Sequence, residues 1–541
     1  MTVTTIRAER VNGSRPGRAA ARLARRQARR AAAMVALTAG GLSALVAAQY
    51  RTTFADSIDA GALRALAENP AVRILFGAPL ALDDPGGFTV WRTGTPVLVL
   101  CGLWALLAAT RLTRGEEDAG HWDLLLSGTL RPVDLVARCA ATLCLAAAVI
   151  ATGLVTGLVV TGTDPTGALL HALCVFGATV AFASVGLLAA QLLPSRAAAA
   201  GLASAVLGAS LLLRMLADGV PALAWTAWLT PFGLAARVAP YAHNRIEPLP
   251  VLAVLAIAPT AAALVIARRR DLGGAPITLS GTRPARTRLL GSVHGFAVRR
   301  ALAPTTGWGA GIAVYFLLIG ALISSILEFF AENPRFAELA ATAGFGGLNS
   351  ATGFAAAIFA LLAIPTGLYA ATRVAALTAD EKARRWTALH ALPLSRYRSA
   401  GTEIAVTAAG LAVLLLTAAL AMWAGAVLTG APLSLSDAIA GAANVSPVAL
   451  LSLGAAALAL GWLPEAVGAV GAVPVVGGFL LDVITQSTDA PTWVGEISPF
   501  AHLAAVPDTA PDWRASLTLT AIAIVAAMIG LYGYTRRDLR G

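Results

Sequence analysis

The sequence predicts an all-α polytopic membrane protein of about 12 transmembrane helices in two parallel six-helix repeats, with both termini cytoplasmic. Of its 541 residues, 57% are hydrophobic and 13% are charged, and the mean hydropathy is +0.74. A soluble chain of this length carries roughly a quarter charged residues, so lipid must act here as part of the solvent. One membrane span needs about 20 apolar residues, and the chain supplies enough for twelve spans.

Twelve apolar segments are expected to cross the membrane, and their bounds follow from the apolar runs alone. In the first half they lie near residues 31–50, 93–110, 139–161, 168–193, 197–216 and 250–267. In the second half they lie near residues 307–326, 351–371, 403–429, 446–463, 466–484 and 515–534. Glycine, proline and polar residues interrupt the fifth and the eleventh of these segments.

The charges between the spans set the expected orientation. Residues 268–306 hold eight arginines against the single acid Asp271, whereas residues 485–513 are acidic. Cytoplasmic loops carry the excess of arginine and lysine, so alternating the sides through twelve spans places both termini inside. This placement of arginine also argues against nucleic-acid binding as the reason for the basic balance.

The chain repeats itself, and the repeat defines its organisation. The sequence Ala-Glu-Asn-Pro at 67–70 recurs at 331–334, and Thr-Pro-Phe at 230–232 is matched by Ser-Pro-Phe at 498–500. Because six spans per half is an even number, the two halves share one orientation. The expected parts are a basic interfacial helix at 1–30, a first half at 31–271, a basic linker or interfacial helix at 272–306, and a second half at 307–541.

An acidic and aromatic motif follows the second span and recurs after the eighth. In the first half it contains Glu116, Glu117, Gly120 and Trp122, and the counterpart contains Glu381 and Trp386 at an offset of 264. At helical spacing, each tryptophan shares one face with the leucines that follow it, which predicts a short amphipathic helix on the cytoplasmic surface. A solvated loop is the alternative, but the recurrence and the large apolar residues argue against it.

This motif resembles the coupling region of type-two ABC exporter permeases. The fused, twelve-span, arginine-rich form is similar to the actinobacterial polyketide-antibiotic and tetronasin-resistance exporter permeases. The resemblance implies that Glu116, Glu117, Gly120 and Trp122, together with Glu381 and Trp386, contact two copies of a separate ABC ATPase subunit. In the second half Arg384 stands where Gly120 stands in the first, so the two contacts need not be equivalent.

The chain shows no ATP site of its own. A P-loop needs the sequence Gly-Lys-Ser/Thr, and the only lysine, Lys382, follows Glu381 without a glycine-rich loop. We also find no zinc-protease motif, no nucleophile elbow and no histidine or cysteine cluster. The chain is therefore expected to be no enzyme and to hold no cofactor or metal, with ATP and Mg bound by the partner ATPase.

In this exporter class the second and fifth spans line the substrate pathway. Carried over by position, the resemblance nominates Trp104, Arg214, Phe354, Phe359 and Asp482. Arg214 and Asp482 are charges inside spans, so either they pair with each other or each reaches separately to the outer interface. Aromatic residues in spans also face lipid or neighbouring helices, and this alternative stays open for each of the three named here.

The function predicted from these features is that of the permease subunit of an ATP-driven exporter in the cell membrane. It would move amphipathic small molecules such as antibiotics, drugs or lipids. A secondary multidrug transporter of the major-facilitator kind is the alternative, although its loop between the second and third spans is basic and this one is acidic. A membrane-embedded enzyme would need clustered acids or histidines at one face, and we find none in the sequence.

Overall fold

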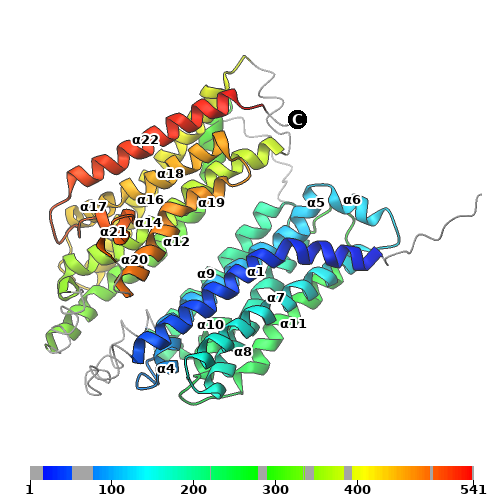
Figure 1. Cartoon of the computed structure of the whole chain (residues 1–541), viewed down its shortest axis with the longest axis horizontal. Helices are drawn as coiled ribbons and strands as arrows, with labels where there is room; N and C mark the ends of the chain where they lie inside the picture. The colour runs from blue at the N-terminus through cyan, green and yellow to red at the C-terminus, as the bar shows by residue number, and fades with distance from the viewer. Residues whose placement is uncertain are drawn as a thin grey trace, which may run out of the picture. The chain divides into compact units, whose positions relative to one another are not determined.

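The computed structural model describes residues 16–51, 73, 77–219, 221–277, 289–332, 334, 346–382, 393–487 and 491–538. Every regular element within these ranges is a helix, and no strand occurs there. The chain divides into two compact units, Met1–Arg283 (unit 1) and Pro284–Gly541 (unit 2) (Figure 1). The all-helical fold class predicted from the sequence is thereby confirmed for the described residues.

The described residues of unit 1 form six long helices and several short elements. The long helices are α1 (Pro16–Gln49), α4 (Pro85–Thr110), α7 (Pro132–Val160), α8 (Pro165–Leu192), α9 (Arg196–Gly219) and α11 (Pro248–Arg269). The short elements are the π turn η2 (Arg111–Gly115), α5 (Glu116–Asp118), α6 (His121–Leu126), the 3-10 turn η3 (Pro221–Leu229) and α10 (Pro231–Val238).

Unit 2 follows a similar order of elements. Its longer helices are α12 (Val293–Glu332), α14 (Ala351–Lys382), α16 (Arg396–Leu428), α17 (Leu435–Asn444), α18 (Ser446–Trp462) and α22 (Trp513–Arg536). Its short elements are η5 (Gly346–Asn349), α19 (Val467–Ala472), the π turn η6 (Val473–Gly477), α20 (Gly478–Ser487), α21 (Thr492–Gly495) and η7 (Pro499–His502).

Eleven helices among the described residues are long and apolar enough to cross a membrane, which makes the chain a multi-pass membrane protein. They coincide with eleven of the twelve predicted segments. The exception is the predicted span 466–484, where the structure has a shorter apolar helix, Val467–Asp482, with a π turn inside it. Pro474 lies in that turn and has no amide proton to donate, which breaks the regular helical pattern. The count of twelve spans is therefore not confirmed.

Two predicted boundaries fall inside continuous helices. Helix α1 runs from Pro16 to Gln49, so the basic stretch before residue 30 and the first span form one helix. Its many alanines favour helix, and neither glycine nor proline occurs near residue 30 to end it. Helix α12 likewise begins at Val293 and continues through Pro304, so the end of the predicted linker 272–306 is helical.

Aspartate and proline fix where two helices begin. Asp84 accepts hydrogen bonds from the amides of Gly86 and Gly87 at 2.8 and 2.9 Å, and Pro85 occupies the first turn of α4. Asp164 caps α8 in the same way. Such a cap contributes ~1 kcal/mol, and proline at the first turn loses no helical hydrogen bond.

The helices of each unit pack in corresponding pairs. In unit 1, α1 packs along α7, and both α4 and α11 pack on α8. In unit 2, α12 packs along α16, and both α14 and α22 pack on α18. In both units the first long helix thus packs on the third, and the second and the last pack on one shared helix, α8 in unit 1 and α18 in unit 2. A duplication would produce this pattern, although the number of spans in each repeat and the sides of the termini stay predictions.

Glycines let the first and third helices of each unit approach closely. A Cβ atom on Gly157 would lie 2.6 Å from the carbonyl oxygen of Gly40, and one on Gly425 would lie 2.2 Å from that of Leu317. Small residues at contacts give membrane helices the dense packing that replaces the hydrophobic effect in lipid. Close approach at a glycine therefore stabilises both the α1–α7 pair and the α12–α16 pair.

Candidate functional site

The connection between α4 and α7 holds the motif singled out from the sequence. Helix α4 continues through the π turn Arg111–Gly115 into α5, and α6 follows after Gly120. Gly120 has a φ of 74°, a left-handed conformation that costs other residues roughly 1 kcal/mol or more. We call residues 111–126 the coupling element; the predicted short helix after the second span is present in it as α6.

Glu117 is the most enclosed acid of the coupling element. Its side chain is 4% exposed, and its two oxygens lie 3.1 Å from an Arg114 guanidinium nitrogen and 2.7 Å from one of Arg270. The amide of Gly273 donates a further hydrogen bond to Glu117 at 2.8 Å. Because Arg270 and Gly273 follow directly after α11, Glu117 ties the end of α4 to the end of α11.

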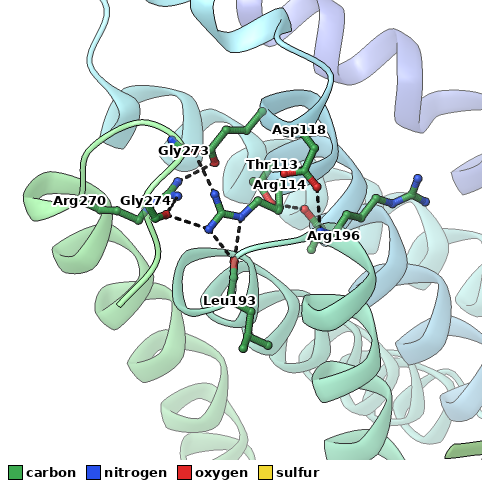
Figure 2. Close-up of polar contacts among 10 residues, drawn as sticks. Thr113, Arg114, Asp118, Leu193, Arg196, Arg270, Gly273 and Gly274 are labelled. Atoms are coloured by element: carbon green, nitrogen blue, oxygen red, sulfur yellow. Dashed lines mark hydrogen bonds and ion pairs between the residues drawn. The ribbon is translucent and has the colours of Figure 1, made fainter. Parts of the chain in front are cut away.

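Arg114 continues this network to α8, as Figure 2 shows. Its guanidinium group donates to the carbonyl oxygen of Leu193 at 2.9 and 2.5 Å and to that of Gly274 at 3.0 Å. Nearby, Asp118 accepts a hydrogen bond from the amide of Arg196, the first residue of α9, at 2.9 Å. The coupling element is thus bonded to three further helices of unit 1 at or beside their ends: α8, α9 and α11.

Trp122 packs α6 against three long helices of unit 1. It is 2% exposed and packs in a cluster with Ala20 of α1, Leu135 and Val136 of α7, and Ala267 of α11. Glu116 lies closer to the surface, where it accepts a hydrogen bond from Gln27 of α1 at 3.0 Å and contacts His121 at 2.8 Å. The predicted shared face of Trp122 and the leucines after it is present, since Leu125 and Leu126 also pack against this cluster.

The opposite face of α6 is exposed. Leu124 is 77% exposed, and His121 and Asp123 are exposed beside it. Although α6 is packed against unit 1 through Trp122, the Leu124 side chain has no packing role within the described part of that unit. The coupling element therefore has a fixed inner face and a free outer face.

Unit 2 carries a related ion pair. Arg537, which follows α22, lies 2.6 and 2.8 Å from the two oxygens of Glu381 near the end of α14. Arg537 also accepts a hydrogen bond on its carbonyl oxygen from Arg396 at the start of α16. In each unit, a glutamate at or just beyond the C-terminal end of the second long helix thus pairs with the arginine that follows the last long helix. Trp386, the predicted partner of Trp122, lies outside the described residues.

A second charge cluster lies beside this pair in unit 2. Glu403 of α16 accepts from Arg300 of α12 at 2.6 Å and from Arg373 of α14 at 2.9 Å, and Arg300 also pairs with Asp380. Three long helices are joined by these contacts. Unit 1 has no counterpart of Glu403 among its described ion pairs.

The five residues nominated for a substrate pathway lie in different surroundings. Trp104 is half-buried and packs against the core of unit 1. Phe354 and Phe359 are buried in unit 2, where Phe359 stacks on Phe316 of α12 at a ring-centre distance of 5.6 Å. Asp482 lies half-buried in α20. No contact among the described residues assigns these four a role in transport, so that role stays a prediction.

Arg214 has a partner on its own helix. Its Nε lies 2.7 Å from an Asp218 oxygen one turn along α9. Sequence reasoning considered Asp482 and the outer interface for Arg214 and missed Asp218, although the spacing of four residues signals such a pair.

Arg270 and Arg537 were also not paired with their glutamates from the sequence, because the partners are far apart in the sequence. The basic endings Arg269-Arg270-Asp271 and Arg536-Arg537-Asp538 are visible in the sequence, but their partners are 153 and 156 residues away. The near-equal separation of these arginines from Glu117 and from Glu381 is the signal that could have identified the two pairs. Within the described ranges, no group of three or more His, Cys, Asp or Glu residues could hold a metal ion.

Comparison with known proteins gives two likenesses. Residues 290–535 match the family described as "Multidrug efflux system permease Rv1217c, C-terminal domain". The chain is 28% identical over 516 residues to the multidrug efflux system permease protein Rv1217c of Mycobacterium tuberculosis, covering 92% of this chain and 90% of that protein. The eleven apolar helices of the described residues and the likeness to a permease agree on a multi-pass protein of the cell membrane.

Proposed function

We propose that the chain is the transmembrane subunit of an ATP-driven exporter and that its ATPase partner docks on the exposed face of α6. The observation that carries the proposal is the two-sided character of the coupling element. Trp122 and Glu117 fix its inner face to three helices, α1, α7 and α11, whereas Leu124 is 77% exposed on its outer face. The likeness to a protein named as a multidrug efflux permease supports export of drug-like molecules.

This arrangement changes the roles of the predicted residues. The resemblance assigned direct ATPase contact to Glu117 and Trp122, but both are buried within unit 1. We assign them the role of positioning residues and assign the contact to His121 and Leu124. Glu116 and Gly120 are also positioning residues. Glu116 holds the start of the coupling element against α1, and Gly120 forms the turn that precedes α6.

The coupling element is suited to transmit a push. A force on α6 passes through Trp122 to α1, α7 and α11, and through Glu117 and Arg114 to the ends of α8 and α11. Buried ion pairs and packed side chains resist deformation, so the helices would move together. In the proposal one ATPase subunit acts on each unit, ATP and Mg are bound by those subunits, and amphipathic molecules are the cargo.

The test is substitution of the exposed leucine. Leu124→Asp should lower co-purification of the expressed ATPase partner about tenfold or more, because interface anchors contribute 2 kcal/mol or more to binding. Since Leu124 makes no buried contact, the thermal stability of the permease should stay within about 1 °C. Leu23→Asp is the matched control: Leu23 is 43% exposed on α1, near the same end of unit 1.

Three outcomes contradict the proposal. The first is an ATPase that co-purifies equally with wild type and Leu124→Asp. The second is equal loss of the partner with Leu124→Asp and with Leu23→Asp, which would indicate a general charge effect. The third is proton-driven transport by the purified chain alone, which would indicate a secondary transporter.

A further inference from the structure

A cavity of about 260 Å³ lies in unit 1, far along α4 from the coupling element. It is formed by the N-terminal parts of α4 and α8, the end of α9, and α10. Its apolar wall includes Trp91 and Leu98 of α4 and Phe232 of α10. Its polar wall contains Arg73, Arg214, Arg237, Asp218 and His171.

The polar wall holds more positive than negative charge. Among the described residues that line the cavity, three are arginines and Asp218 is the only acid. Asp218 pairs with the Nε of Arg214 at 2.7 Å, and all three arginines lie near enough to act on its charge. One carboxylate cannot balance three guanidinium groups, so the cavity favours an anion.

Several nitrogen atoms in this wall are buried without a hydrogen-bond partner among the described residues, and each can donate (His171 in the tautomer that carries the proton on Nε2). They are one terminal nitrogen (Nη1) of Arg214, the Nε of Arg237 and the Nε2 of His171, whose side chain is almost fully enclosed. Arg237 is nevertheless held in place, because its Nη2 donates to the carbonyl oxygen of Ala224 at 2.6 Å and its guanidinium lies 4.9 Å from the Trp228 ring centre. A buried donor without an acceptor costs free energy that a bound anion would recover.

We propose that this cavity binds the anionic head of an amphipathic molecule, a carboxylate or phosphate carried on an apolar body. Arg214, Arg237 and His171 would donate to the anion, and Trp91 and Phe232 would contact the adjoining apolar part. The volume is just under the ~300 Å³ at which small-molecule pockets begin, so the head and the first part of the body fill it. The site is independent of the ATPase contact, which lies beyond the opposite end of α4.

The test uses the full-length protein in nanodiscs of phosphatidylcholine, with decanoate as the probe. Decanoate should bind saturably in calorimetry, and decyltrimethylammonium, which has the same body and the opposite charge, should not. Arg237→Gln should weaken decanoate binding about tenfold or more, because it removes a charge-assisted donor. Arg245→Gln, which removes an exposed arginine from the α10–α11 connection outside the cavity, should leave it unchanged.

A second variant guards against loss of folding. Arg214→Gln together with Asp218→Asn removes both members of the buried pair, so neither charge is left alone. This double variant should keep its helical circular dichroism and its elution volume and should also bind decanoate more weakly. Equal affinity in the wild type, the Arg237 variant and the double variant would overturn the proposal, as would equal binding of decyltrimethylammonium.

The source of the anion is read from a second set of nanodiscs made with phosphatidylglycerol. If an anionic lipid occupies the cavity, decanoate binding disappears in these discs, and native mass spectrometry finds phosphatidylglycerol retained by wild type and lost from Arg237→Gln. If a free amphipathic molecule is the ligand, decanoate binding persists there. Failure of the ATPase test with retained decanoate binding would refute the proposed function and leave this site standing.

Discussion

Replacing Glu117 by glutamine removes the negative charge at the centre of the coupling element. The carboxylate lies between Arg114 and Arg270, which are 1% and 5% exposed in their side chains, and accepts the Gly273 amide. Glutamine keeps the shape and one acceptor oxygen, but it leaves two buried guanidinium groups facing each other without a compensating charge. The end of α11 should then lose its attachment to α4.

The magnitude follows from the burial of all three groups. Breaking a buried ion pair by removing one partner costs about 3–5 kcal/mol, because the remaining charge stays desolvated. Glutamine still accepts one hydrogen bond, so the lower part of that range is expected. At about 2 °C per kcal/mol for a large domain, the melting temperature should fall by roughly 6 °C. Glu116→Gln is the matched control: Glu116 lies nearer the surface, and exposed pairs contribute ~0–1 kcal/mol.

The assay is thermal unfolding of the purified permease in detergent, followed by tryptophan fluorescence, with Trp122 close to the perturbed site. Equal melting temperatures for Glu117→Gln, Glu116→Gln and wild type would refute the reasoning. A Glu117→Gln protein of normal stability that no longer retains the ATPase would place this carboxylate at the interface itself and contradict its role as a positioning residue.

Four further predictions concern the scaffold. Trp122→Ala should destabilise the permease by about 3–5 kcal/mol in the same unfolding assay, because it empties a buried site between three helices, whereas Trp493→Ala, exposed in α21, should be nearly neutral. Gly120→Ala should cost about 1–2 kcal/mol through its left-handed backbone, and an equal cost for Ala119→Gly would argue against that cause. Glu381→Gln should cost less than Glu117→Gln, about 1.5–3 kcal/mol, since its pair is more exposed, and the reverse order would be unexpected. Gly425→Val should lower the yield of folded protein in size-exclusion chromatography by forcing α16 away from α12, whereas Gly311→Val, at a position of α12 where an added Cβ meets open space, should not.

The membrane-spanning helices could be predicted from the sequence because each one is encoded by a continuous apolar segment. Runs of about 20 apolar residues identify spans without knowledge of their neighbours, and eleven of the predicted segments correspond to helices of sufficient length. The segment 466–484 is helical but is not confirmed as a span, and hydropathy did not register the π turn at Pro474, which lacks an amide proton. The continuity of α1 across residue 30 was not predicted, because positive charge marks a change of surroundings and does not end a helix rich in alanine.

The coupling element could be predicted only in part, because the residues that contact it are distant in the sequence. Glu117 and Trp122 were identified as important from their recurrence, but the sequence did not reveal that both are buried. Burial depended on Arg270 and on Ala20, Leu135 and Ala267, which come from three other helices. The cavity beside Arg214 depended on the folding of α8 and α10 against α4, so His171 and Arg237 carried no recognisable motif.

Cross-linking from the outer face of α6 tests the central claim most directly. Cys144 is the exposed native cysteine and would first be replaced by serine, since Cys101, Cys139 and Cys174 are buried. Leu124→Cys in this background, treated with a short bifunctional maleimide in the complex with the ATPase partner, should give a covalent permease–ATPase species, and Leu23→Cys should not. No such species from Leu124→Cys, in a complex that still co-purifies, would contradict docking on α6.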